Sequence, residues 1–212
     1  MDAAEQAANP VAVILGLLLA GVLGVIFLIV GALAGANTAG GGGGFTIPAG
    51  GTTTQNVLRW RDQVCQYAQT YAPQAGTSVA EFDNWVFATM TQESGGVLPA
   101  NSHAGAEGLM QLMPGTAADE GFTGDLQDPS VNLPAGEDYI ASRWQQYGGN
   151  LGALAAAYNG GDGVGKEYLQ GGLGATPTET QGYVPAVLAN YGAYSKLPQD
   201  ACGAMMPSKK GG

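Results

Sequence analysis

Glu93 is a carboxylic acid at the end of an apolar helical stripe. Apolar residues recur before it at steps of three and four, as on the buried face of a helix: Val79, Phe82, Val86 and Met90. The next step of three reaches Glu93, so we expect its carboxyl group to point toward the protein interior. The sequence Ser-Gly-Gly at 94–96 follows at once and predicts the end of the helix.

The expected position of Glu93 favours its protonated form. Burial disfavours a charged carboxylate, and the free carbonyl groups at a helix C-terminus add a partial negative charge, so both effects raise its pKa. An acid that keeps its proton near neutral pH can act as the general acid in the cleavage of a glycosidic bond. The alternative is a glutamate that turns to solvent in the last helical turn, and the stripe alone does not separate the two.

Other catalytic chemistries lack the residues that they need. His103 is the only histidine, and it lies in a stretch of Ser, Ala and Gly, where we expect a solvated loop residue rather than a member of a catalytic triad. The sequence contains no HExxH, CxxC or GxxxxGKS motif. It therefore predicts no metal site and no cofactor.

The composition fits one globular domain with additional segments. Of the 212 residues, 45% are hydrophobic and 11% are charged, which leaves enough apolar material for a core. The formal net charge of -10 argues against nucleic acid as the main partner, because phosphates would be repelled by an acidic surface. An uncharged or mixed-charge polymer is compatible with this charge.

An uncharged apolar stretch runs from Val11 to Leu33, after a short leader at 1–10. Its length suffices to cross a bilayer as a helix of about 20 residues. The stretch exceeds the roughly 7–15 residues of a signal-peptide core, and the leader has no Lys or Arg, so we expect an uncleaved transmembrane helix. The alternative is a secreted protein that is cleaved near Ala34. Residues 34–54 are rich in glycine and predict a flexible tether.

Residues 55–197 read as a succession of helices, followed by a C-terminal tail at 198–212. Hydrophobic periodicity and capping residues predict helices at 57–71, 79–93, 114–119, 132–147, 150–159 and 178–191. Asn132 is expected to cap the fourth helix, and Thr178 with Gln181 to form a capping box for the last one. A glycine-rich loop is expected at 160–177. No stretch alternates as a strand, so the predicted fold class is all-α.

Cys65 and Cys202 are the two cysteines of the chain, and they are too few to form a metal site alone. In an oxidising compartment they would form one disulfide between the first soluble helix and the tail, whereas in the cytosol they would stay reduced. Sequence spacing does not decide between these states, because a bridge depends on how closely the two Cα atoms approach.

Four segments carry a resemblance to a known family. In chain order they are Glu93 with Ser94, GLMQLMP at 108–114, AAYNGG at 156–161 and ETQGYV at 179–184. Together they resemble the lytic transglycosylases of the soluble-lysozyme-like, goose-lysozyme-related family, over about Val79 to Tyr194. The resemblance implies a lysozyme-like helical domain.

The resemblance also implies a reaction. Glu93 would protonate the bond between N-acetylmuramic acid and N-acetylglucosamine in peptidoglycan, and would then act as the base that helps the muramic 6-hydroxyl close a 1,6-anhydro ring. One enzyme carboxyl group suffices in this family, because the substrate's own N-acetyl group stabilises the cationic centre where other glycosidases use a second carboxylate.

Residues around Glu93 receive implied roles from the same family. Ser94 would help to hold the catalytic residue, and Tyr183 would place its hydroxyl group near it. The other substrate-binding residues that the resemblance implies are Gly108, Leu109, Met110, Gln111, Tyr158 and Asn159.

Individual members of this set have more specific expectations. Gln111 would hydrogen-bond sugar amides, and Gly108 would let the backbone approach the glycan. Core packing is the competing role for Met110, Met113 and Tyr158, because methionine and tyrosine at such spacings commonly fill a core.

Three positions depart from the family pattern. Gly96 stands where many relatives carry an aromatic residue, and Gln181 stands where the family has the arginine of ETR. Glu107 directly precedes GLMQ, and it offers an alternative as the second carboxylate of a true hydrolase.

The resemblance therefore implies a peptidoglycan lytic transglycosylase, which we expect to serve local cell-wall remodelling or penetration. We expect it to be a single-pass protein of the cytoplasmic membrane, held by Val11 to Leu33, with its catalytic domain outside and glycan strands as its partner. The alternatives are a lysozyme-type hydrolase, or a non-catalytic wall-binding component of a secretion, conjugation or phage apparatus. A secreted or virion-associated location is the corresponding alternative.

Overall fold

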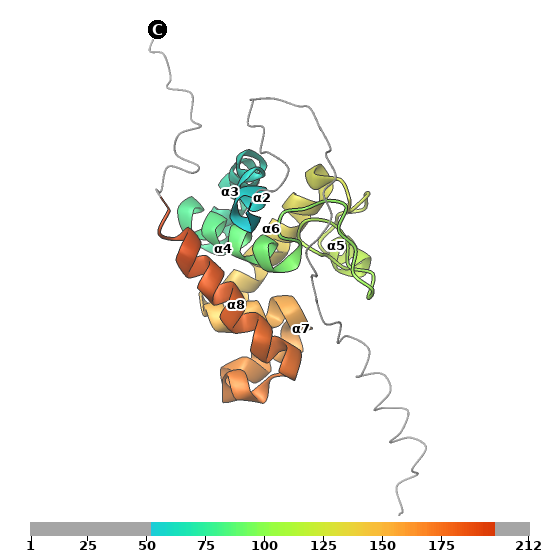
Figure 1. Ribbon diagram of the computed structural model, residues 1–212. Helices are drawn as coiled ribbons and strands as arrows, with labels where there is room; N and C mark the ends of the chain where they lie inside the picture. The colour runs from blue at the N-terminus through green and yellow to red at the C-terminus, as the bar shows by residue number, and fades with distance from the viewer. Residues whose placement is uncertain (1–51, 198–212) are drawn as a thin grey trace, which may run out of the picture.

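The computed structural model describes residues 52–197, which are helical apart from their connections (Figure 1). The only extended pairings within that range are isolated bridges that join Glu107 to Asn101 and to Leu112. The all-α prediction is thus confirmed for residues 52–197. Among these residues, no helix has the length and apolar character required to cross a membrane. The expected leader, membrane segment and tail lie outside the described residues, and so does nearly all of the tether.

The described elements follow one another with short connections, except for one long loop before α5. Their bounds are α2 Thr53–Leu58, α3 Arg61–Ala75, α4 Val79–Glu93, α5 Pro114–Asp119, α6 Pro129–Gln146, α7 Leu151–Gly171, the 3-10 helix η1 Leu173–Ala175 and α8 Thr178–Tyr194.

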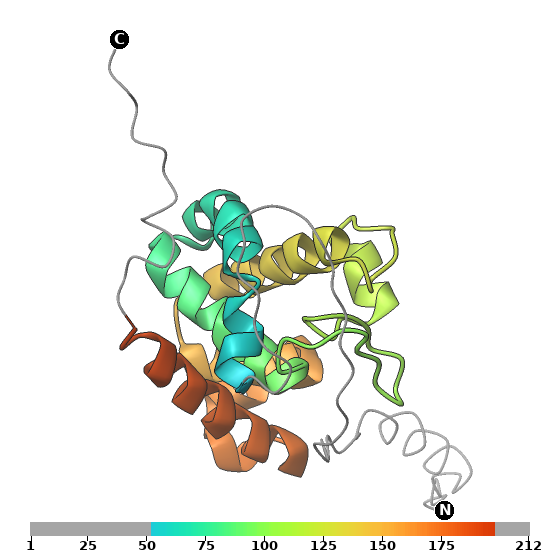
Figure 2. The same ribbon diagram turned by 45° about the horizontal axis from the view of Figure 1, so that its top comes forward.

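Helix α4 lies at the centre of the domain, between α3 and α8 (Figures 1 and 2). Ser78 caps its N-terminus by accepting a hydrogen bond from the Glu81 backbone N–H at 3.2 Å. The predicted apolar stripe is buried, with Phe82, Val86 and Met90 fully covered. The stripe therefore fixes the rotation of α4 about its axis, and this rotation brings Glu93 to the interior at the C-terminal end.

The predicted helix at 57–71 is wrong in one respect, because the chain breaks at Arg59 and Trp60 into α2 and α3. Both side chains donate hydrogen bonds to the backbone oxygen of Gly96, Arg59 Nη2 at 2.6 Å and Trp60 Nε1 at 2.9 Å. The break thus lets two donors reach the turn that follows Glu93.

Helix α6 begins earlier than expected. Asp128 caps it by accepting from the Ser130 N–H at 2.8 Å, and Pro129 occupies the first turn, so Asn132 is not the capping residue. Asn132 lies inside the helix and is completely buried. The Asp-Pro pair is a stronger start signal than the asparagine, because proline at the first helical position lacks the N–H that would be unsatisfied there.

The expected loop at 160–177 is also wrong, because α7 continues to Gly171 beyond a kink at Gly161. Gly161 has φ 81°, a left-handed conformation that glycine adopts without strain. Further along, a Cβ at Gly165 would lie 2.5 Å from the Tyr147 hydroxyl, so the glycine there serves close packing rather than a loop.

The capping box predicted for the last helix is absent. Pro177 is the N-cap residue of α8, Thr178 is already helical, and no side chain caps the first turn. The Gln181 amide instead donates to the backbone oxygen of Thr176 at 2.8 Å. The side chain of Gln181 therefore secures the preceding turn.

Candidate active site

Glu93 is the last residue of α4, and its side chain is 9% exposed. The Tyr183 hydroxyl of α8 donates a hydrogen bond to Glu93 Oε1. Burial raises the pKa of Glu93 to about 8; the hydrogen bond from Tyr183 opposes this rise, and the charge of Glu179 adds to it. The carboxyl group therefore keeps its proton at neutral pH, as the sequence led us to expect.

Residues from α7 and α8 surround this carboxyl group. Tyr183 is 8% exposed, and burial first, then the charge of Glu93, raises its pKa well above the ordinary value, so its hydroxyl stays a donor. On α7, the charge of Glu93 contributes, after burial, to the raised pKa of Tyr158. Asn159 Oδ1 accepts from the Thr180 hydroxyl at 2.7 Å, which joins α7 just before its kink to the first turn of α8.

The loop Gly108 to Gln111 packs against the end of α4 and is held by three other parts of the fold. The Ser94 hydroxyl donates to the backbone oxygen of Leu109 at 2.7 Å. The Tyr158 hydroxyl donates to the backbone oxygen of Met110 at 2.8 Å, and the Met110 N–H donates to Asn132 Oδ1 at 2.7 Å. Ser94 at the C-cap of α4, Asn132 of α6 and Tyr158 of α7 thus hold the backbone groups of Leu109 and Met110.

Gly108 has φ 76°, and the space beside it is filled by the protein itself. A Cβ there would lie 2.1 Å from the backbone oxygen of Leu126 and 2.4 Å from Asn132 Nδ2. The structure thus gives this glycine a role within the protein itself, and the approach of a glycan to it stays a prediction. Glycine is required because the loop crosses the chain's own backbone at close range.

Gln111 has the only positive φ, 46°, among the non-glycine residues of the described range. Its side-chain nitrogen donates to the backbone oxygens of Ala100 at 3.0 Å and Gly108 at 2.9 Å. Its Oε1 is buried and accepts no hydrogen bond from residues 52–197. An unsatisfied acceptor on an immobilised amide is suited to receive an N–H or O–H donor from a ligand.

The side chains of Leu109 and Met110 are completely buried and belong to the core. Met110 packs against Gly136 of α6, where an added Cβ would lie 2.7 Å from Met110 Cγ. Core packing is therefore what the structure shows for these side chains, while their peptide groups bond to Ser94, Asn132 and Tyr158, and contact with substrate stays a prediction. Tyr158 combines both roles, since its ring contacts Tyr139 at 5.4 Å between centroids while its hydroxyl holds the loop.

Asn132 is the residue of this site that sequence reasoning missed. Besides accepting from Met110, its Nδ2 donates to the backbone oxygen of Glu107 at 3.0 Å, so one buried amide satisfies two peptide groups of the loop. Recognising Asp128 and Pro129 as the helix start would have placed Asn132 inside α6, with its side chain free for this contact.

Glu107, His103 and the two cysteines were also singled out in the sequence. Glu107 pairs through its backbone with Leu112, and the acid whose charge acts on Glu93 is Glu179 instead. His103 is exposed in the loop before α5. Cys65 is buried, but Cys202 lies outside the described residues, so their disulfide stays a prediction.

Comparisons with known proteins agree with this arrangement. Residues 72–172 match the family described as "Transglycosylase SLT domain". The soluble lytic murein transglycosylase of Escherichia coli K12 is 36% identical over 130 residues, and that of Salmonella typhimurium is 35% identical, each alignment covering 52% of this chain. The chain spans about a fifth of the length of these curated relatives, since the matches cover 20% of each.

A solved structure shows the same helical fold. The inactive mutant of the lytic transglycosylase Slt from Pseudomonas aeruginosa matches with a TM-score of 0.52 and 31% sequence identity. The match covers 61% of this chain and 23% of that one. The sequence match, the fold and the buried glutamate agree, and residues 72–172 of this chain are similar to the transglycosylase SLT domain family.

Proposed function

We propose that this chain is a peptidoglycan lytic transglycosylase in which Glu93 is the catalytic acid and base. The observation that carries the proposal is the buried Glu93 carboxyl group, with its pKa raised to about 8 and a hydrogen bond from Tyr183. The relatives are named soluble lytic murein transglycosylases, and the similar solved structure is a glutamate-to-glutamine mutant described as inactive.

The first step is a proton transfer from Glu93. The carboxyl proton goes to the oxygen between the muramic and glucosamine residues, the bond from the muramic C1 to that oxygen breaks, and the glucosamine end leaves as an alcohol. Because Glu93 is protonated at neutral pH in the free protein, the acid is ready when the glycan binds.

The second step returns the proton. The Glu93 carboxylate takes the proton of the muramic 6-hydroxyl as its oxygen attacks C1, which closes the 1,6-anhydro ring without consuming water. The Tyr183 hydroxyl, which donates to Glu93 Oε1, stabilises the carboxylate that exists between the two steps. Gln111 Oε1, an unsatisfied buried acceptor, would bind a donor of the glycan such as an acetamido N–H.

The direct test is a digest of purified peptidoglycan followed by mass spectrometry of the released muropeptides. We expect 1,6-anhydro ends from the wild-type chain and a loss of about a thousandfold in rate for Glu93→Gln, because the amide has the shape of the acid but cannot donate that proton. Glu167→Gln, at an exposed position of α7, is the matched control and should keep wild-type activity.

Each other result of that digest has a distinct meaning. New reducing ends would show hydrolysis of the same bond, with Glu179 as the first residue to examine for a second carboxylate, because its charge already acts on Glu93. A folded wild-type chain that binds glycan without cutting it would indicate a wall-binding component. Wild-type turnover by Glu93→Gln would reject the assignment of the acid.

We also propose that Val11 to Leu33 anchors the domain in the cytoplasmic membrane, with the domain on the outer side. The support is the uncharged apolar run and the glycine-rich tether that follows it. Carbonate extraction of membranes should retain the full chain in the pellet and release a variant that lacks 11–33. Cleavage near Ala34, detected by N-terminal sequencing of the mature protein, would contradict the anchor.

A further inference from the structure

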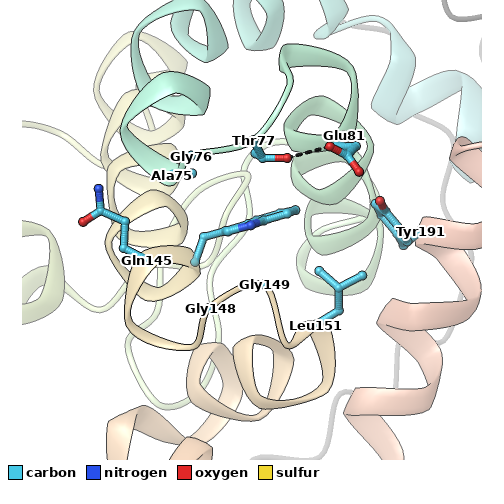
Figure 3. A pocket seen from close by; sticks show the side chains of 10 residues that line it. Ala75, Gly76, Thr77, Glu81, Gln145, Gly148, Gly149, Leu151 and Tyr191 are labelled. Atoms are coloured by element: carbon cyan, nitrogen blue, oxygen red, sulfur yellow. Dashed lines mark hydrogen bonds between the residues drawn. The ribbon is translucent and has the colours of Figure 1, made fainter.

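A cavity of about 460 Å³ lies at the opposite end of α4 from Glu93 (Figure 3). This volume is within the range of roughly 300–1,000 Å³ that is typical of ligand sites. Glu81 lines it from the first turn of α4, 12 residues before Glu93, which corresponds to roughly 18 Å along a helix. The side chains that line it include Thr77, Glu81, Trp144, Gln145, Leu151 and Tyr191. The cavity is therefore separate from the candidate active site.

Glu81 is the only charged residue of the cavity lining, and its surroundings favour the ionised carboxylate. The hydroxyl groups of Thr77 and Ser78 donate to its Oε2 at 2.7 Å and 3.1 Å. These hydrogen bonds, with Thr77 first, lower the pKa of Glu81, so the carboxylate is ionised at neutral pH. Its Oε1 accepts no hydrogen bond from residues 52–197, which leaves one carboxylate oxygen for a ligand.

The rest of the lining combines apolar and aromatic side chains with polar groups and glycine backbone. Trp144 and Leu151 contribute apolar surface, and Tyr191 packs with its ring 5.6 Å from that of Trp85. Burial first, and then the charge of Glu81, raises the pKa of Tyr191, which agrees with the two lying side by side in Figure 3. The three side chains Trp144, Leu151 and Tyr191, placed beside a carboxylate, can receive a ligand side chain with an apolar stem and a cationic tip.

The hydrogen bonds to Glu81 also favour one of the two cationic side chains, lysine and arginine, over the other. A guanidinium group binds a carboxylate best through two parallel hydrogen bonds, one to each oxygen. Oε2 of Glu81 already accepts from two hydroxyl groups, so only Oε1 remains to accept a hydrogen bond from a ligand. A single acceptor suits the compact ammonium group of lysine. We propose that this cavity binds a lysine side chain of a partner peptide, in preference to arginine.

The partner's charge is consistent with that of the chain. The formal net charge of -10 attracts a basic peptide, and the cavity lining contains no Lys, Arg or His that would repel it. Binding at this position does not involve Glu93, so it is independent of the proposed catalytic activity.

The test is a titration of the full chain followed by NMR of the tryptophan indole N–H groups. The probe is acetyl-Gly-Lys-Gly-amide, and matched peptides carry arginine or uncharged norleucine in place of lysine. We expect a saturable shift of the Trp144 signal with a dissociation constant on the order of 1 mM, because an ion pair at the surface contributes little. Trp60, which bonds to Gly96 near the other end of α4, serves as the internal reference. Equal binding of the lysine and norleucine peptides would overturn the proposal.

Variants locate the binding on Glu81. We expect Glu81→Gln to weaken lysine-peptide binding about threefold, corresponding to about 0.7 kcal/mol. Glu167→Gln removes the same charge from an exposed position of α7 and should bind as the wild type does. Thr77→Val removes one hydroxyl donor from Oε2 and should reduce the preference for lysine over arginine. Thermal unfolding of each variant shows whether it is folded, and unchanged binding by folded Glu81→Gln would refute the site.

Two further variants identify the occupant. Glu93→Gln should leave lysine-peptide binding unchanged, which separates this site from the catalytic proposal. Lys209→Ala with Lys210→Ala removes the lysines that lie beyond residue 197. Unchanged affinity in that double variant supports an external partner. A gain of more than about fivefold would show that the chain's own lysines compete for the cavity, and would overturn the assignment to a partner.

Discussion

At the scale of single residues, three neighbouring effects set the pKa of Glu93, and they do not all act in the same direction. Burial raises its pKa most, the hydrogen bond from Tyr183 lowers it, and the negative charge of Glu179 raises it again, with a result of about 8. Tyr183 and Glu179 lie four positions apart in ETQGYV, so one helical turn of α8 carries both the group that favours the carboxylate and the group that opposes it.

Substitutions in this turn should move the pH profile in opposite directions. The acid must be protonated to cleave the glycan, so we expect kcat/KM to fall as pH rises through about 8. Tyr183→Phe removes the hydrogen bond that lowers the pKa of Glu93, so the fall in kcat/KM should move to higher pH. Glu179→Gln removes a charge that raises this pKa, so the fall should move to lower pH. Rates of anhydro-muropeptide release from pH 5 to pH 10 measure both. A fall that stays at the same pH in both variants would contradict this account.

At the scale of elements, the loop at 108–111 depends on contacts made far from it in sequence. Asn132 of α6 satisfies the Met110 N–H and the Glu107 oxygen, and Tyr158 of α7 satisfies the Met110 oxygen. Gly108 makes the arrangement possible, because any side chain there would overlap the backbone oxygen of Leu126. The loop is thus a rigid connection between helices, and this rigidity positions the free oxygen of Gln111.

Two glycine substitutions separate conformational strain from overlap. Gly105→Ala places alanine at φ 90°, a strained backbone conformation, but its Cβ would meet no other atom within 4 Å. We expect this substitution to lower the unfolding free energy by about 1 kcal/mol. Gly108→Ala adds a Cβ that would lie 2.1 Å from the Leu126 oxygen, so we expect a cost of more than about 3 kcal/mol together with a loss of activity. Urea unfolding of both variants measures the difference. Equal costs would show that the loop has room to move away from Leu126.

At the scale of the whole molecule, the core contains acids as well as apolar side chains. Glu137 of α6 is completely buried, and neither carboxyl oxygen has a hydrogen-bond partner within residues 52–197. Burial, and then the nearby Asp83, raises the pKa of Glu137 well above its ordinary value. Burial likewise raises the pKa of Asp83 from 3.8 to about 7. With Glu93, the fold therefore contains three carboxyl groups that are neutral in the native state at mildly acidic pH.

The stability of the domain should consequently decrease as pH rises. Above pH 4.5 these acids ionise in the unfolded chain but keep their protons in the folded one, so the unfolded state binds fewer protons and the unfolding free energy falls. The contributions of Asp83 and Glu93 to this fall end when these two groups ionise in the folded chain, at about pH 7 and about pH 8. Glu137→Gln removes one such group and should raise the melting temperature at pH 8 by about 5 °C, with little effect at pH 4.5. Glu167→Gln, at an exposed site, is the control. A wild-type melting temperature that rises from pH 5 to pH 8 would contradict the prediction.

The sequence by itself determined the helical fold class and the apolar stripe that sets the rotation of α4, and it predicted the inward position of Glu93 without excluding a solvent-facing one. These follow from preferences that act within a few residues, such as the apolar period of three and four, and from motifs whose order is visible in the chain. The helix at 79–93 and the start of α5 at Pro114 were predicted with the bounds that the structure has.

Only the tertiary structure decided the features that depend on contacts between distant segments. The break at Arg59 and Trp60 depends on an acceptor at Gly96, the requirement for Gly108 depends on Leu126, and the cavity at Glu81 forms where the ends of several helices meet. A glycine has the same local signal whether it ends a helix or lets a neighbour pack closely, so α7 could not be followed past Gly161 from the sequence. The physical reason is that packing distances and hydrogen-bond partners are set by the assembled helices, after local preferences have chosen the helices themselves.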